Sequence, residues 1–162
     1  MLARERIEVA SGENIKVLAR RVFGRNAPRL ARVPEDFAEV PGAQGYHPGW
    51  VYHGCFMGPA VQAVRLVRHM VRRYSELAEV HRLGAGPPGR PWSEAAYGLG
   101  TMAGEFGALG QVVGHSGVGP FSCCTVYHLP ATNVSVAVFA EGTDEGVPER
   151  EAVRMLERLS VA

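Results

Sequence analysis

Short apolar segments with strand-like composition fill the last third of the chain. They cover residues 97–102, 112–120, 121–129 and 134–140, and they are rich in β-branched and aromatic residues. Gly, Pro or Asn punctuates these segments, which is the usual pattern of antiparallel strands joined by turns. We therefore expect an antiparallel sheet of about three C-terminal strands within residues 97–140.

Other segments have the periodicity of helices. Residues 2–23 predict two helices, the first ending near Gly12 and the second beginning at Asn14, a favoured N-cap residue. The clearest helical pattern lies in 59–80, where an apolar stripe lies opposite a row of arginines. That stripe comprises Ala60, Ala63, Val64, Val67, Met70, Val71 and Tyr74. A last amphipathic helix is expected over 148–160.

Proline and glycine interrupt the segment 25–58 throughout, and we expect it to be a loop. Long segments of this kind in a compact domain are usually binding loops or flexible connections. The whole chain, residues 1–162, then reads as a single α+β domain in which helices flank the C-terminal sheet.

Composition narrows the possible partners. The chain has 162 residues, of which 46% are hydrophobic and 20% charged, and its net charge is +1. This balance is that of an ordinary globular protein and favours neither nucleic acid nor an anionic membrane as a partner. No apolar segment reaches the roughly 18 residues of a membrane span. The N-terminal residues lack the apolar core of a signal peptide, so the sequence as written predicts a cytoplasmic protein.

The central strand carries Gly114-His115-Ser116-Gly117, an imidazole and a hydroxyl between two glycines. Tyr97-Gly-Leu-Gly precedes this motif, and Phe121-Ser, a Val-rich strand and the C-terminal helix follow it. This order resembles the C-terminal part of the serine β-lactamase and penicillin-binding protein superfamily, whose third motif is Lys-Thr-Gly. The chain looks most like the class C and esterase-like branch, in which His-Ser-Gly often stands at that place.

The resemblance implies an incomplete β-lactamase/transpeptidase-like fold and a hydrolase that forms an acyl-enzyme from a β-lactam, a D-alanyl peptide or an ester. By position it assigns substrate-binding roles to His115, Ser116, Gly117 and Val118. His115 stands where the family has its lysine, and the Ser116 hydroxyl would engage the substrate carboxylate. The backbone N–H of Val118 would be one of two oxyanion-hole donors. No cofactor is implied.

The two other family motifs are absent from this sequence. No serine is followed by lysine three positions later, because Lys16 is the only lysine, and no tyrosine is followed by asparagine two positions later. The nucleophile and the tyrosine base are therefore missing, and we expect the chain to be inactive alone. Two hypotheses stay open: a truncated or split serine hydrolase that needs an N-terminal polypeptide, and a non-catalytic binding or assembly module.

A missing N-terminal half has a structural consequence. Residues 134–140 would form an exposed apolar strand edge, and such edges favour pairing with another chain. We expect either self-association or an N-terminal partner at this edge.

The proline-rich segment offers two weaker candidates. His47, His53 and Cys55 lie close in sequence, but no further ligand completes a metal site of three or four. A metal-dependent hydrolase that uses His47, His53 and His115 is a third hypothesis. An aromatic wall beside the substrate, built from Tyr46, Trp50 and Tyr52, is an alternative to plain core packing.

Overall fold

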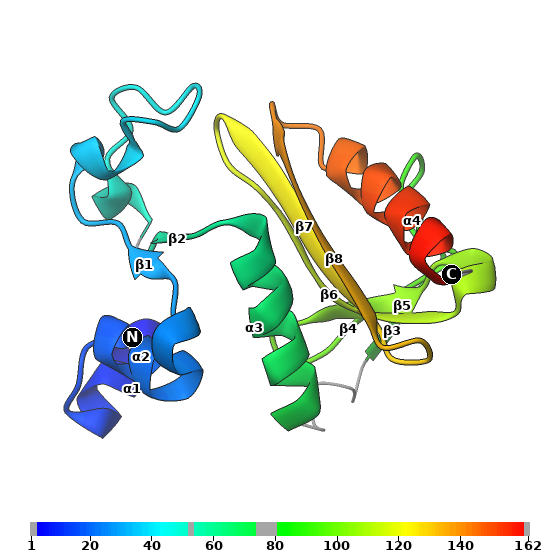
Figure 1. Cartoon of the computed structure of the whole chain (residues 1–162), viewed down its shortest axis with the longest axis horizontal. Helices are drawn as coiled ribbons and strands as arrows, with labels where there is room; N and C mark the ends of the chain where they lie inside the picture. Colours follow the sequence, from blue (N-terminus) through cyan, green and yellow to red (C-terminus); the bar gives the residue numbers. More distant parts are fainter. Residues whose placement is uncertain (1–2, 52–53, 74–80, 161–162) are drawn as a thin grey trace. The chain divides into compact units, whose positions relative to one another are not determined.

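The computed structural model describes residues 3–51, 54–73 and 81–160, and the chain divides into two compact units, 1–62 and 63–162 (Figure 1). That residues 1–162 belong to one domain stays a prediction. None of the described helices is both long and apolar enough to cross a bilayer.

The first unit begins with helices α1 (Ala3–Ser11) and α2 (Ile15–Phe23). The Asn14 side chain accepts a hydrogen bond from the Val17 N–H at 3.1 Å. The same N–H also donates to the Asn14 backbone carbonyl at 3.0 Å, so Asn14 caps α2 as its sequence position predicts.

The proline-rich segment contains short regular elements where we expected only loop. Strands β1 (Arg29–Leu30) and β2 (Phe56–Met57) pair antiparallel, and the Ala31 N–H extends this pairing to the Cys55 carbonyl at 2.9 Å. The short 3-10 helices are η1 (Gly24–Asn26), η2 (Pro34–Phe37) and η3 (Pro48–Trp50). Two-residue strands have no periodicity of their own, so the sequence pattern does not reveal them.

The second unit contains a six-stranded antiparallel sheet. The strands are β3 (His81–Gly84), β4 (Glu94–Tyr97), β5 (Met102–Glu105), β6 (Gln111–Val118), β7 (Ser122–Leu129) and β8 (Val134–Glu141). They lie in sequence order, so each strand pairs with the next along the chain. The 3-10 helix η5 (Gly107–Leu109) joins β5 to β6.

The α+β class is confirmed, but the expected sheet of about three strands is wrong. The three long strands β6, β7 and β8 are the ones that the sequence pattern predicts, although the first begins at Gln111. Strands β3, β4 and β5 have only four residues each and contain Ala and Gly, which have low β-propensity. They form because each pairs with a neighbouring strand in the sheet, a contact that local sequence does not encode.

Helix α4 (Gly146–Ser160) packs on the face of the sheet that carries the core. Alternate residues of β7 point to this face and are almost completely buried, as the two-residue repeat of a strand requires. The core comprises Trp92, Phe106, Val112, Tyr127, Leu129, Val136, Ala152 and Leu156. Adjacent Cys123 and Cys124 differ in burial, the first being buried and the second half-buried, as expected for opposite faces of one strand.

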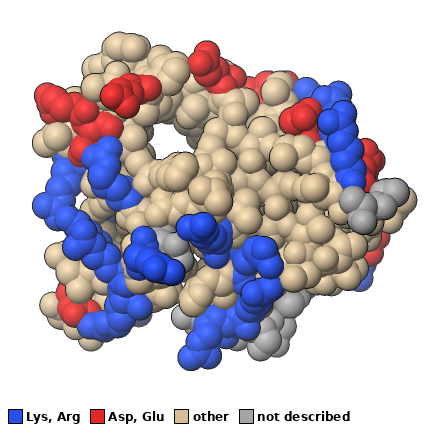
Figure 2. Space-filling model, in the orientation of Figure 1, with Lys and Arg blue, Asp and Glu red and all other residues tan. Residues whose placement is uncertain are grey.

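Helix α3 (Ala60–Arg73) confirms the first part of the helix expected over 59–80, whereas residues 74–80 lie outside the described residues. Val67 is buried on the apolar stripe. Lys and Arg side chains gather over α3 on the face shown in Figure 2. Arg72 donates to the Asn133 side-chain oxygen at 3.1 Å, so this basic face also contacts the β7–β8 turn.

Candidate functional site

Strand β6 is paired over most of its length on one side but over only part of it on the other. β7 pairs with it as far as Val118, whereas β5 pairs with it only as far as Gly114 (Figure 1). Residues 115–118 therefore have no strand partner on the β5 side within the described part of the chain. We call residues 115–118 the open edge.

The backbone groups of the open edge alternate in direction. The Gly119 N–H donates to the Ser122 carbonyl at 2.7 Å, toward β7. Since successive N–H groups of a strand point to opposite sides, the Val118 N–H points away from β7. The Ser116 N–H points to that same side, where it lies 3.4 Å from Met102 Sδ. The open edge thus presents a backbone donor at Val118 on the side away from β7, and the Val118 residue as a whole is 53% exposed.

The imidazole of His115 contacts a tyrosine from a strand that does not pair with β6. Tyr97 Oη in β4 lies 3.0 Å from His115 Nε2, and the two ring centroids are 6.0 Å apart, edge to face. His115 Nδ1 contacts the Ser116 carbonyl, which can only accept a hydrogen bond. In the neutral imidazole the proton is therefore on Nδ1, and Nε2 accepts the Tyr97 O–H. This pair is exposed to solvent.

Ser116 points to the opposite face of the sheet from His115. The residue is buried, and its hydroxyl lies 3.2 Å from Met102 Sδ and accepts from Arg90 Nη2 at 3.3 Å. The structure therefore separates the imidazole and the hydroxyl that the sequence motif places side by side. In this conformation the Ser116 hydroxyl is held by Arg90 and does not face solvent beside His115.

The two glycines of the motif have different reasons to be glycine. A Cβ at Gly114 would collide with the Val126 carbonyl and with the ring of Tyr127. Gly114 therefore allows close packing in the core. A Cβ at Gly117 would meet nothing within 4 Å. Gly117 thus lies beside open space, and a substrate-binding role for residues 115–118 stays a prediction.

A buried ion-pair network lies directly behind Ser116. Glu149 in α4 is 0% exposed and accepts hydrogen bonds from Tyr127 Oη at 2.7 Å, from Trp92 Nε1 at 3.3 Å and from the Arg90 guanidinium. Arg90 also donates to Glu145 Oε2 at 2.7 Å. These hydrogen bonds connect the loop before β4 with α4 and with strand β6. They therefore hold Arg90 in the position from which it donates to Ser116.

The network shifts the proton affinities of its members. Burial acts to raise the pKa of the Glu149 carboxyl, but the hydrogen bonds from Arg90 and Tyr127 outweigh burial and hold this pKa below its usual value. Hydrogen bonding to Glu149 raises the pKa of Arg90. Burial and the adjacent carboxylate also raise the pKa of Tyr127. The Arg90–Glu149 pair is therefore ionised at neutral pH, and the neutral Tyr127 hydroxyl donates its proton to Glu149.

Sequence reasoning missed Tyr97 as a site residue and missed the Arg90–Glu149 pair. One signal for the pair was available, because Glu149 falls on the apolar stripe of α4 three residues before Ala152 and seven before Leu156. A charged residue at such a position indicates a buried partner. No comparable signal connects Tyr97 with His115, since their contact depends on how β4, β5 and β6 are arranged.

The aromatic residues of the proline-rich segment pack against one another. The Tyr46 ring contacts Phe37 at 5.5 Å and Trp50 at 5.3 Å between centroids, both edge to face. Tyr52 lies outside the described residues, and whether this cluster lines a substrate site stays a prediction.

No group of three His, Cys, Asp or Glu side chains suited to a metal ion occurs among the described residues. His53, which both metal hypotheses used, lies outside them.

Comparison of the chain with protein-family models, curated proteins and solved structures finds no match. The interpretation of the site therefore depends on its geometry and on the motif residues.

Proposed function

We propose that this chain supplies the substrate-binding strand of a serine hydrolase related to β-lactamases and penicillin-binding proteins, with the nucleophile coming from residues that this sequence does not contain. The observation that carries the proposal is the open edge of β6, where the Val118 N–H points away from β7 beside an exposed His115–Tyr97 pair. An extended acyl substrate can pair with such an edge through its own backbone.

Each exposed group has a chemical role in this proposal. The Val118 N–H donates to the developing oxyanion, a contact that contributes a few kcal/mol to transition-state stabilisation (roughly 3). His115 Nε2 and Tyr97 Oη form a polar pair that can accept or donate a proton near the leaving group. The substrate is a β-lactam, a D-alanyl peptide or an ester, all of which share an attackable carbonyl.

Covalent labelling with a fluorescent penicillin tests the proposal. The chain alone is expected to remain unlabelled. The same chain mixed with an N-terminal polypeptide that carries Ser-x-x-Lys and Tyr-x-Asn, taken from the DNA directly upstream, is expected to give a labelled band that survives denaturation. A label on the chain alone would show that the nucleophile lies within it. Upstream DNA that encodes neither motif would rule out the split enzyme.

Two variants of one residue separate the backbone donor from its side chain. Val118→Pro removes the N–H without removing a ladder hydrogen bond to β7, whereas Val118→Ala keeps the N–H. In the mixture with the N-terminal polypeptide, we expect Val118→Pro to slow acylation by the penicillin about 100-fold and Val118→Ala to have little effect. Equal acylation rates for the two variants, both folded by circular dichroism, would contradict a donor role for Val118.

A second candidate function is that of a non-catalytic assembly module, and strand β8 favours it. Among the described strands β8 is at the end of the sheet and pairs with β7 alone. Charged residues and proline usually protect an edge strand from pairing with another chain. Residues 134–140 of β8 contain neither. A second copy of the chain, or an N-terminal partner, would add a strand there.

A further inference from the structure

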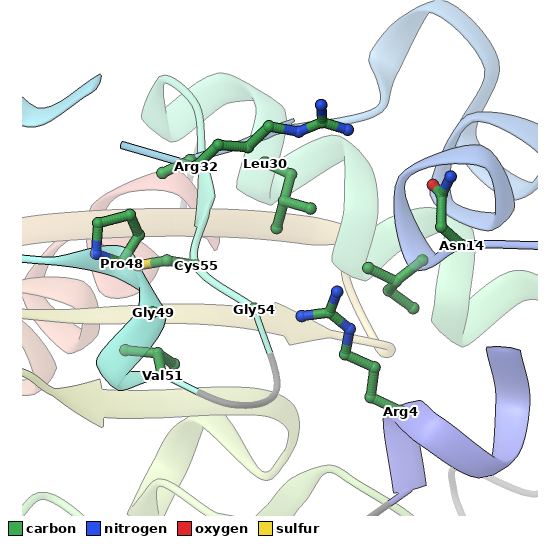
Figure 3. A pocket seen from close by; sticks show the side chains of 11 residues that line it. Arg4, Asn14, Leu30, Arg32, Pro48, Gly49, Val51, Gly54 and Cys55 are labelled. Carbon is green, nitrogen blue, oxygen red and sulfur yellow. The ribbon is translucent and has the colours of Figure 1, made fainter. Parts of the chain in front are cut away.

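The first unit contains a cavity of about 400 Å³ that none of the preceding roles uses. Its walls come from α1, from the start of α2, from β1 and the residue after it, and from the segment around η3 (Figure 3). The volume falls within the range of small-molecule sites, which is roughly 300–1,000 Å³.

Backbone hydrogen bonds hold these walls in place. The Ala31 N–H donates to the Cys55 carbonyl at 2.9 Å, and the Gly54 N–H donates to the Val51 carbonyl at 2.9 Å. Glu8, which does not itself line the cavity, accepts a hydrogen bond through its side chain from the N–H of the lining residue Ile15 at 2.7 Å. The cavity is therefore bounded by segments with defined backbone conformations.

The lining combines an apolar surface with positive charge. Ile15, Leu30, Ala31, Pro48 and Val51 supply the apolar part. Arg4 and Arg32 supply two guanidinium groups, and none of the described residues that line the cavity is Asp or Glu. Figure 3 shows the Arg4 guanidinium close to Gly54.

The charge balance favours a ligand with one negative charge. Arg4 Nε is paired with Glu8 Oε1 at 3.2 Å, so the two arginines and this carboxylate together leave one positive charge. Burial raises the pKa of the Cys55 thiol, which is therefore neutral and adds no negative charge to the lining. A single net positive charge beside apolar walls is best matched by a monoanion with an apolar body.

We propose that this cavity binds a small organic monocarboxylate, with its carboxylate on Arg4 and Arg32 and its apolar body against Leu30, Pro48 and Val51. Arginine suits this role because its planar fork of N–H donors matches the two oxygens of a carboxylate. A dianion such as phosphate would exceed the available positive charge and would leave the apolar walls without contact.

Calorimetric titration of the full chain with octanoate, octanamide and inorganic phosphate tests this site. Octanamide has the same shape as octanoate without its charge, so the difference between the two isolates the carboxylate. We expect saturable binding of octanoate only. Equal binding of octanoate and octanamide, tighter binding of phosphate, or no binding of octanoate would each overturn the proposal.

Arginine variants locate the binding. Arg4→Gln and Arg32→Gln are each expected to weaken octanoate binding about tenfold, since a hydrogen bond to a charged group is lost. Arg6→Gln is the matched control, because it removes the same charge from an exposed position of α1 that does not line the cavity. An equal loss of binding in Arg6→Gln would indicate attraction by net charge alone and would contradict a built site. Retained binding in both cavity variants would contradict it as well.

Discussion

Glu149 has no solvent exposure, yet it remains charged because Arg90, Tyr127 and Trp92 all donate to it. Removing one partner of a buried ion pair is costly, because the other charge keeps its desolvation penalty without its compensating interaction. The stability of the second unit is therefore sensitive to this carboxylate.

We predict that Glu149→Gln lowers the free energy of unfolding by about 3 kcal/mol, because the uncharged amide leaves Arg90 without its buried counterion. Urea denaturation followed by Trp fluorescence measures the change. Glu157→Gln, an exposed position on the same helix, is the control and should stay within about 0.5 kcal/mol of the parent chain. A loss below about 1 kcal/mol for Glu149→Gln would mean that the pair contributes little net stability.

His128 makes stability depend on pH. It is 4% exposed, its Nδ1 lies 2.8 Å from Ser135 Oγ, and burial together with Arg68 and Arg72 lowers its pKa. The unfolded chain therefore binds a proton more readily than the folded chain. The stability associated with the neutral imidazole is fully present above the unfolded pKa of about 6.5 and is lost as pH falls from there toward the lower folded pKa.

We predict that the free energy of unfolding decreases as pH is lowered from 7 to 5, and that His128→Asn removes part of this slope. Asparagine keeps a polar group near Ser135 but does not titrate. Urea denaturation at pH 5, 6 and 7 for both proteins checks the prediction. Identical slopes would show that other groups account for the pH dependence.

At the scale of single elements, the sequence pattern predicted what local periodicity encodes. The eight-residue strands β6, β7 and β8 and the N-cap at Asn14 were predicted because their signals lie within a few residues of each other. The four-residue strand β4 was missed because Glu94-Ala-Ala-Tyr has no such signal. The same limit applies to the site. His115 was identified from its motif, whereas its partner Tyr97 and the burial of Ser116 follow from sheet register.

Strand β8 combines an uncharged edge with an exposed aromatic residue. Phe139 is 52% exposed. Strand β8 pairs with β7 through eight residues without a bulge. An antiparallel pair of two copies centred on Ala137 would place Ser135 opposite Phe139 and Val136 opposite Val138. The small Ser135 would then leave room for the Phe139 ring, and two β-branched valines would face each other across the junction.

We predict that the chain forms dimers through β8 and that Phe139→Lys shifts them toward monomers, because a lysine on an edge strand opposes pairing. Sedimentation velocity over a range of concentrations measures the change. Val118→Lys is the matched control: Val118 is similarly exposed at 53% but lies on β6, away from this edge. A monomeric parent chain at high concentration, or an equal effect of both variants, would contradict pairing through β8.

At the scale of the whole molecule, the two units differ in how much they bury. Neither α1 nor α2 has a buried residue, and among the described residues of the first unit the buried hydrophobic side chains are Ala31, Phe37 and Ala43. The second unit buries Trp92, Tyr127 and Leu156 in its core. Because apolar burial is the main stabilising contribution, at about 25 cal/mol per Å², the second unit should have the higher local stability.

We predict from this difference that amide hydrogens of β6, β7 and β8 exchange with solvent far more slowly than those of α1 and α2, measured by mass spectrometry. The Glu149→Gln variant extends the test. It should speed exchange in β6, β7 and β8, whose protection depends on the core that Glu149 joins, and leave α1 and α2 unchanged. Faster exchange in all of these elements would mean that the two units unfold as one, and slow exchange in α1 would mean that burial is a poor guide to local stability in this chain.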